Sequence, residues 1–312
     1  MKSIVICGPT ASGKTDLALE LARQAGGGII SADSRQVYKQ LTIGTAKPQG
    51  TYHNGLYTVE GVPYWLVDFL EVTDTFNAGA FCTRVHQIQA AYPHIPLIFA
   101  GGTGLYLHSF FVGMDNLPPS TAQSRAQMQA LLAKHGKEGL HRLLAQQDPA
   151  CAAQIPPSNI QRTMRALELC LLTSRPASQL KSGRFFAQPD PHQAHWVYLM
   201  WDKEALNKRI TKRTEQMFDG MCTEAKNLLA QGYTVTTPAL KTLGYPQVIS
   251  YLSGTCSRSQ ALEQIITKTR QYAKRQRTWF NRYTHAQRIT LKCSEDFDTK
   301  KLTQEILSCV SR

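Results

Sequence analysis

Short apolar runs alternate with amphipathic segments along the first part of the chain. Four apolar runs predict strands, namely Ile4–Cys7, Gly28–Ser31, a run near Trp65–Phe69, and Leu97–Ala100. Two segments with apolar residues at helical spacing predict helices, Asp16–Arg23 and Ala78–Ala91. Strands that alternate with helices are typical of a parallel sheet covered by helices. The first 110 residues therefore predict an α/β fold.

The pattern changes near Leu117, where Pro118 and Pro119 break the chain. Apolar residues at helical spacing then predict three short helices, Ala122–Lys134, Glu138–Gln146 and Ile160–Leu172. Since no strand pattern interrupts these segments, we interpret residues 118–190 as an all-helical insertion domain.

The chain returns to an apolar run at Trp196–Trp201, which predicts a further strand of the sheet. Two long helical segments follow, Lys203–Gln231 and Arg258–Tyr283, and the second is rich in basic residues. We therefore predict a core domain made of residues 1–117 and 191–312, with the basic helices in its C-terminal part.

The first predicted strand opens directly into a glycine-rich loop. The spacing of Gly8, Gly13, Lys14 and Thr15 fits the phosphate-binding pattern G-x-x-x-x-G-K-[ST]. In such a loop backbone N–H groups turn toward phosphate oxygens, the lysine adds a positive charge, and the threonine hydroxyl reaches Mg²⁺. The sequence therefore predicts a P-loop NTPase-like parallel sheet flanked by helices. It binds a phosphate or diphosphate, with ATP as a second candidate, through Gly8, Pro9, Thr10, Ala11, Ser12, Gly13, Lys14 and Thr15.

Composition narrows the class of protein. The 312 residues are 42% hydrophobic and 18% charged, which is ordinary for a soluble globular protein. We expect no membrane association, because no apolar run approaches the roughly 20 residues that span a bilayer. Met1 leads directly into the first strand, so a cleavable signal would remove the phosphate-binding loop. The eight cysteines form no C-x-x-C pair, which favours reduced thiols in the cytoplasm over zinc or disulfides.

The net charge of +13 favours a polyanionic partner, most simply nucleic acid, although a basic proteome or plain solubility also explains it. Residues 268–282 hold six Lys and Arg without one Asp or Glu. Four aromatic residues are interleaved with them and can stack on unpaired bases, Tyr272, Trp279, Phe280 and Tyr283. The alternative is a helix that buries these aromatics in the core and leaves a solvated basic face.

Two strand ends carry candidate chemistry. Asp33 follows the strand Gly28–Ser31 and is placed to accept a proton from a nucleophile, although it could instead cap a turn or helix. Gly101-Gly102-Thr103-Gly104 follows Leu97–Ala100, where an NTPase would often place an acid. Asp68 is a weak candidate for that acid. Because machinery for hydrolysis is not evident, the loop is expected to hold a diphosphate as a leaving group, with a small-molecule kinase as the alternative.

Arginines occur in two further places. Arg209 and Arg213 lie four residues apart and so share one face of the predicted helix, where they can grip a diphosphate. Arg162 and Arg165 open the helix Ile160–Leu172. Solvated surface arginines are the alternative in both places.

The ordered set of motifs resembles the tRNA dimethylallyltransferases, also called tRNA isopentenyltransferases, over nearly the whole chain. Its most specific part is Asp33-Ser34-x-x-x-Tyr38 followed by Ile43-Gly44-Thr45-Ala46-Lys47-Pro48. The other parts are the phosphate-binding loop, Gly101–Tyr106, Gln161-Arg162-x-x-Arg165-Ala166-Leu167-Glu168, Gly244-Tyr245 and Lys274-Arg275-Gln276-x-Thr278-Trp279-Phe280.

The resemblance implies an enzyme that transfers a dimethylallyl group from dimethylallyl diphosphate to tRNA. The acceptor is N6 of the adenosine 3′-adjacent to the anticodon, position 37, in tRNAs that read codons beginning with U. Asp33 is implied as general base, assisted by Thr103, and Arg213 joins the phosphate-binding loop on the diphosphate. The implied contacts to the tRNA anticodon stem-loop are Asp33, Ser34, Arg35, Gln36, Thr103, Arg125, Gln161, Arg162, Thr163, Met164, Arg165, Lys241, Thr242, Leu243, Gly244, Tyr245, Pro246, Lys274, Arg275, Gln276, Arg277, Thr278, Trp279, Phe280 and Asn281.

The chain departs from the family's pattern at Tyr64-Trp65, where members often carry His-His, and at Pro246, where a charged residue often follows Gly-Tyr. A chain that ends at Arg312 without a zinc finger favours the bacterial type, and we expect a monomer. Three rivals stay open: an adenylate isopentenyltransferase, a small-molecule kinase, and an RNA-binding module that uses a nucleotide as a switch.

Overall fold

The computed structural model describes residues 2–180 and 182–310, so the chain end at Arg312 lies outside the described residues. The chain forms two compact units, Met1–Phe111 with Gln188–Arg312, and Val112–Ala187. The second unit begins before Pro118, where the sequence predicts its start, because the extended segment already bonds within that unit. Asp115 accepts the N–H of Ser182, and the Pro118 carbonyl accepts a hydrogen bond from Arg165.

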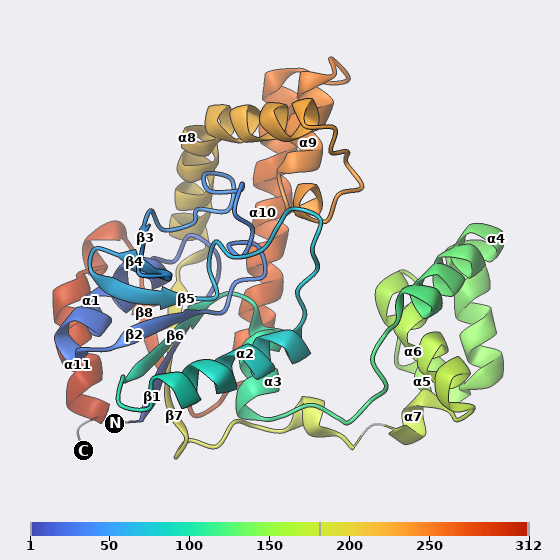
Figure 1. Ribbon diagram of the computed structural model, residues 1–312, viewed down its shortest axis with the longest axis horizontal. Helices are drawn as coiled ribbons and strands as arrows, with labels where there is room; N and C mark the ends of the chain where they lie inside the picture. The colour runs from blue at the N-terminus through green and yellow to red at the C-terminus, as the bar shows by residue number, and fades with distance from the viewer. Residues whose placement is uncertain (1, 181, 311–312) are drawn as a thin grey trace. The chain divides into compact units, whose positions relative to one another are not determined.

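Among the described residues, the first unit contains one eight-stranded sheet in the order β3-β4-β5-β2-β6-β1-β7-β8 (Figure 1). From β5 onward the neighbouring strands run parallel, while β3, β4 and β5 pair antiparallel. The bounds are β1 Ser3–Cys7, β2 Gly28–Ser31, β3 Thr51–His53, β4 Leu56–Val59, β5 Val62–Trp65, β6 Leu97–Gly101, β7 Ala194–Trp201 and β8 Gln287–Leu291.

Four of the five predicted strands are confirmed, and the run Trp65–Phe69 is wrong. The strand β5 ends at Trp65, where that run was expected to begin. Leu66 and Asp68 have φ angles of 61° and 56°, a left-handed conformation that cannot continue a strand. Leu66 and Val67 are buried in the bend that follows β5.

Helices cover both faces of the sheet, and alternate residues of each strand point to opposite faces. Ile4 and Ile6 pack with α1 and α11 on one face, whereas Val5 packs with α2 and α3 on the other. A third core joins α8, α9 and α10 with residues 37–41, beyond the sheet (Figure 1). The helix bounds are α1 Lys14–Ala25, α2 Ala78–Ala91, α3 Gly104–Phe111, α8 Lys203–Ala230, α9 Tyr245–Leu252, α10 Arg258–Phe280 and α11 Thr299–Val310, with short 3-10 turns η2 Ala239–Lys241 and η3 Ser294–Asp296.

The described residues of the second unit form helices only, around a core that includes Met128, Leu140 and Leu167. Gly136 has a non-helical conformation inside α4, so the chain breaks between the predicted helices Ala122–Lys134 and Glu138–Gln146, as expected. The elements are α4 Ala122–Gln147, α5 Pro149–Ala153, α6 Ile160–Thr173, α7 Ala177–Leu180 and a 3-10 turn η1 Arg184–Phe186.

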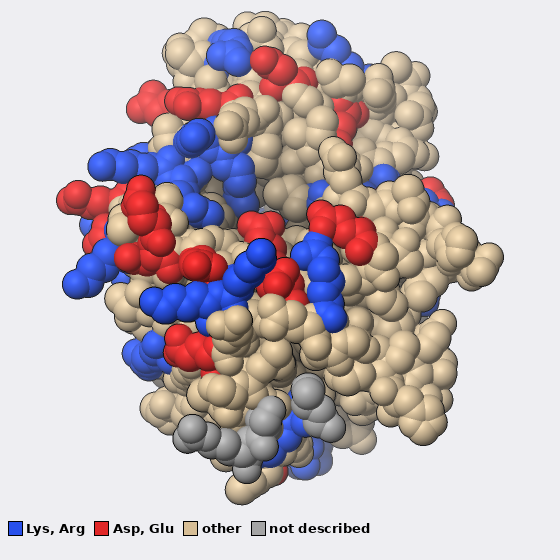
Figure 2. All heavy atoms as spheres, turned by 90° about the vertical axis from the view of Figure 1, so that its left-hand side faces the viewer, with Lys and Arg blue, Asp and Glu red and all other residues tan. Residues whose placement is uncertain are grey.

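Charges of both signs lie side by side on the face at the left of Figure 1. Figure 2 shows Lys and Arg side chains there among Asp and Glu side chains. The net positive charge of the chain is therefore not concentrated on this face. Across residues 2–180 and 182–310, the structure contains no helix with the length and apolar character needed to cross a bilayer.

Candidate active site

A pocket of about 590 Å³ lies at the carboxyl ends of β1, β2 and β6. The phosphate-binding loop after β1, Asp33 after β2, and Gly101 and Gly102 at the end of β6 all line it. Carboxyl ends of neighbouring parallel strands meet at one edge of a sheet, which is where open α/β proteins bind their ligands. The structure therefore brings together the chemical groups that the strand ends predict.

The phosphate-binding loop is held from outside by side chains of later elements. Trp201 on β7 donates its indole N–H to the Ser12 carbonyl at 3.0 Å, and Arg209 on α8 donates to the Ala11 carbonyl at 2.8 Å. The Arg209 guanidinium lies 4.3 Å from the Trp201 ring centroid, in cation–π contact. Gly13 has a φ of 87°, and a Cβ there would lie 2.3 Å from the Phe297 ring. Only glycine fits this position.

Lys14 begins α1 and lines the pocket. Its ammonium donates to the Pro9 carbonyl at 2.7 Å and to the Ser12 hydroxyl at 3.4 Å. Burial lowers the pKa of Lys14 to about 8, while the nearby Asp33 carboxylate opposes the shift and Arg213 adds to it. The lysine is therefore a desolvated cation that gains most from a negatively charged ligand.

Arginines on α8 supply further positive charge. Arg209 and Arg213 both line the pocket, on the shared face that their spacing predicts. Arg213 donates to the Thr10 hydroxyl at 2.5 Å, and burial lowers its pKa while Asp33 opposes that shift. Two guanidiniums and one ammonium thus lie around the loop, an arrangement suited to a diphosphate.

The turn that begins at Asp33 is linked to Thr103 through the backbone N–H of Ser34. One carboxylate oxygen of Asp33 accepts N–H groups from Arg35 at 2.8 Å and Gln36 at 3.3 Å. The other oxygen accepts no hydrogen bond from any residue within 2–180 or 182–310, which leaves it able to take a proton. The Thr103 hydroxyl accepts the N–H of Ser34 at 3.1 Å. Asp33 therefore caps a turn and also faces the pocket.

The donor set suits Mg²⁺. The Thr15 hydroxyl and the Asp33 carboxylate line the same pocket, and Mg²⁺ takes oxygen ligands of this kind together with phosphate oxygens. Tyr64 on β5 also lines the pocket.

The α10 helix has two different sides. Lys274, Arg275, Thr278 and Asn281 are exposed, and Arg277 and Trp279 are half-buried. Phe280, expected to contact tRNA, is fully buried in the sheet core, as is Tyr283. For these two aromatics the alternative of a core-packing helix is correct, since no ring surface is left for a base.

The segment Lys241–Pro246 is likewise mostly internal. Lys241 is exposed, and Leu243 and Pro246 are half-buried, but Thr242, Gly244 and Tyr245 are buried. The Tyr245 hydroxyl donates to Glu224 on α8. The expected tRNA contact of the three buried residues is therefore corrected to a supporting role, because their side chains pack between helices.

In the second unit, Arg125, Gln161 and Arg162 are exposed. Thr163 is buried and donates to the Asn159 carbonyl, so its expected tRNA contact is corrected. Met164 is half-buried and packs on the core of this unit.

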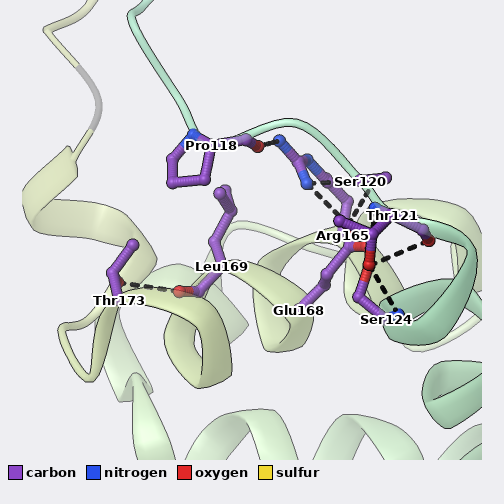
Figure 3. A network of polar contacts seen from close by, with 8 residues as sticks. All are labelled: Pro118, Ser120, Thr121, Ser124, Arg165, Glu168, Leu169 and Thr173. Carbon is purple, nitrogen blue, oxygen red and sulfur yellow. Dashed lines mark hydrogen bonds and ion pairs between the residues drawn. The ribbon is translucent and has the colours of Figure 1, made fainter.

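Arg165 belongs to a polar network that ties α6 to the start of α4 (Figure 3). Its guanidinium donates to Glu168 at 2.6 Å, to Ser120 at 3.1 Å and to the Pro118 carbonyl at 2.5 Å. Ser120 and Ser124 also donate to the buried Glu168 carboxylate. These hydrogen bonds hold the Arg165 guanidinium inside the unit. Arg165 therefore supports the expected tRNA-binding surface more than it forms part of that surface.

Several residues of the site belong to no motif or spacing pattern that the sequence shows. Trp201 and Phe297 contact the loop, and Tyr64 lines the pocket, from strands and turns far along the chain; no motif marks these three residues. Arg209 and Arg213 could be predicted, since their spacing places them on a single helix face.

The fold and the site define an α/β protein of the phosphate-loop class, with a carboxylate beside the loop. The chain belongs to the IPP transferase family, whose pattern it matches over residues 36–283, and the isopentenyl transferase pattern matches residues 1–59. The resemblance drawn from the sequence is thereby confirmed, and the chain is a prenyl-transferring enzyme.

Relatives and solved structures agree with this assignment. The chain is 51% identical to a tRNA dimethylallyltransferase of Elusimicrobium minutum, over 90% of this chain and 92% of that protein. It is similar to the crystal structure of a tRNA delta(2)-isopentenylpyrophosphate transferase from Staphylococcus epidermidis, with a TM-score of 0.67, 31% identity, and coverage of 99% and 98%. A eukaryotic dimethylallyltransferase acting on tRNA shares the fold at a TM-score of 0.74 and 22% identity, over 99% of this chain and 78% of that one.

Proposed function

We propose that this chain transfers the dimethylallyl group of dimethylallyl diphosphate to N6 of the adenosine at position 37 of tRNAs that read codons beginning with U. The products are N6-isopentenyladenosine and diphosphate. The observation that carries the proposal is that Asp33, Lys14 and Arg213 line one pocket beside a basic helix, while Thr103 holds the turn that carries Asp33. The names of the relatives support the same reaction.

In this reaction the N6 nitrogen attacks the allylic carbon while the carbon–oxygen bond to the diphosphate breaks. The leaving diphosphate gains negative charge, which Lys14, Arg213 and the backbone N–H groups of the loop stabilise. The attacking amine becomes acidic as its bond to carbon forms, and its proton passes to the free carboxylate oxygen of Asp33. Thr103 holds the turn that carries Asp33 through the N–H of Ser34.

Thr15 is the proposed Mg²⁺ ligand, and the ion would add charge neutralisation on the diphosphate. Part of the pocket wall is apolar and includes Leu19, Val59 and Pro48. This apolar part suits a five-carbon hydrocarbon group. The exposed side of α10, with Lys274, Arg275 and Thr278, is the proposed surface for the anticodon stem-loop.

Incubation of the protein with dimethylallyl diphosphate and either AMP or an anticodon stem-loop separates this function from its rivals. We expect prenylation of the stem-loop at one adenosine and none of AMP. Prenylated AMP would identify an adenylate isopentenyltransferase. Phosphate transfer from ATP to a small molecule would identify a kinase, and ATP-dependent RNA binding without prenylation would identify a nucleotide-switched module.

The cytoplasmic location, the monomeric state and the binding of ATP stay predictions.

A further inference from the structure

Gln276 differs from the neighbouring polar residues of α10. Lys274 and Arg275 are exposed, whereas Gln276 is 5% exposed and lines the pocket. Its side-chain carbonyl accepts the N–H of Thr10 at 2.8 Å, and its amide donates to the Gly102 carbonyl at 3.0 Å. A buried amide that is bonded at both ends is held in one orientation.

Both partners of Gln276 belong to the two loops that form the site. Thr10 lies in the phosphate-binding loop, and Gly102 directly precedes Thr103. The backbone of Gly102 packs closely on the amide, since a Cβ there would lie 2.1 Å from Nε2. Only a side chain that accepts and donates at once can bridge these loops.

Thr10 is therefore fixed from two helices. Arg213 on α8 donates to its hydroxyl at 2.5 Å, and Gln276 on α10 accepts its N–H at 2.8 Å. Removing the Gln276 amide frees the loop on that side, because the N–H of Thr10 and the carbonyl of Gly102 would each lose their partner.

We infer that Gln276 is a positioning residue for the diphosphate site: it sets the phosphate-binding loop against the turn that carries Thr103, and it makes no contact with RNA. The inference rests on the proposed function in one respect: dimethylallyl diphosphate is assumed to be the physiological ligand of the site. Inorganic pyrophosphate serves as the probe, because its binding requires no transfer reaction.

Two variants test the inference by titration calorimetry with pyrophosphate. Gln276→Met keeps the volume and removes both hydrogen bonds, so pyrophosphate should bind about tenfold more weakly, or worse. Affinity for the anticodon stem-loop should stay within about twofold. Unchanged pyrophosphate affinity in this variant, or an equal loss of RNA affinity, would overturn the inference.

Gln276→Glu provides a pH signature that a folding defect would not reproduce. An ionised carboxylate cannot donate to Gly102 and repels the ligand, whereas a protonated carboxyl group accepts and donates like the amide. Burial disfavours the ionised form and should raise the pKa of a carboxyl group at this position above its ordinary value of about 4.3, so the deficit relative to wild type should be large at about pH 8 and shrink toward about pH 5. Gln271→Glu, an exposed position on the same helix, should stay close to wild type at both values.

A deficit of Gln276→Glu that stays constant with pH would also overturn the inference. A wild-type protein that fails to bind pyrophosphate would overturn the inference, whereas the stem-loop assay decides the proposed function by itself. Pyrophosphate binding without any prenyl transfer would overturn the proposed function alone.

Discussion

Tyr245 on α9 donates its hydroxyl hydrogen bond to Glu224 on α8, and the same carboxylate shapes the turn at residues 42–44. Glu224 accepts the backbone N–H groups of Thr42 at 2.8 Å, Ile43 at 2.7 Å and Gly44 at 3.1 Å. One acidic side chain thus organises both the Ile43–Pro48 block and the Gly244-Tyr245 motif. These two motifs are far apart in sequence and meet at a single carboxylate.

Replacing Glu224 by Gln should destabilise the protein without touching the pocket. The amide replaces one accepting oxygen by a donor, which leaves a backbone N–H or the tyrosine hydroxyl without an acceptor. We expect Glu224→Gln to lower the free energy of unfolding by about 1–3 kcal/mol in urea titrations. Glu215→Gln, an exposed position on the same helix, is the matched control and should change little. Equal stabilities for the two variants would contradict the role given to Glu224.

Asp33→Asn should remove the proton acceptor while it keeps the shape of the side chain. Turnover should fall by about 10²–10⁴-fold, and dimethylallyl diphosphate and the stem-loop should still bind. Single-turnover kinetics with saturating substrates measure the loss. Turnover within about threefold of wild type would exclude Asp33 as the general base.

Diphosphate affinity should depend on the protonation of Lys14. Its pKa is lowered to about 8, so the ammonium loses its proton as the pH rises through that value, and the negatively charged ligand favours the protonated form. Affinity for dimethylallyl diphosphate should therefore fall above about pH 8, by at most tenfold per pH unit. Lys14→Ala should bind more weakly and lose this dependence. A pH profile shared by wild type and Lys14→Ala would assign the titration to another group.

Stem-loop affinity should depend strongly on salt, because each neutralised phosphate releases condensed counterions. Replacing both Lys274 and Arg275 by Ala should lower the slope of log affinity against log salt by about one unit per lost contact. Diphosphate affinity should stay nearly unchanged. The double variant of Lys300 and Lys301, exposed on α11, removes the same charge and serves as control. An unaltered slope for Lys274 and Arg275 would mean that RNA binds elsewhere.

Local patterns predicted the elements that carry a local signal, such as a continuous apolar run or a capping residue. The strand Gly28–Ser31 and the helix Ala78–Ala91 have the predicted bounds, since the strand is a continuous buried run and the helix begins at a capping residue, Asn77. The β3–β4 hairpin was not predicted, because β3 is exposed along its length and has no alternation to detect. The left-handed residue Leu66 ended β5 inside an apolar run, and no apolar pattern reveals such a conformation.

The candidate site was predicted where strand ends and motifs define it, as with Asp33 and the phosphate-binding loop. The motifs did not show whether a residue lies on the exposed side or on the buried side of its helix. Gln276 and Phe280 stand within the same motif as Lys274, yet both are buried. The Trp201 and Gln276 contacts to the loop join residues separated by 189 and 266 positions, so they depend on the finished fold.

These long separations have a consequence for synthesis on the ribosome. The phosphate-binding loop is made among the first residues, but its strand β1 pairs with β7, which begins only at Ala194. Until then one edge of β1 lacks that neighbour, and an unpaired strand edge invites association with other chains. The pairing of this strand is therefore completed only after β7 has been made, so the loop that follows β1 gains its supporting neighbour late in synthesis.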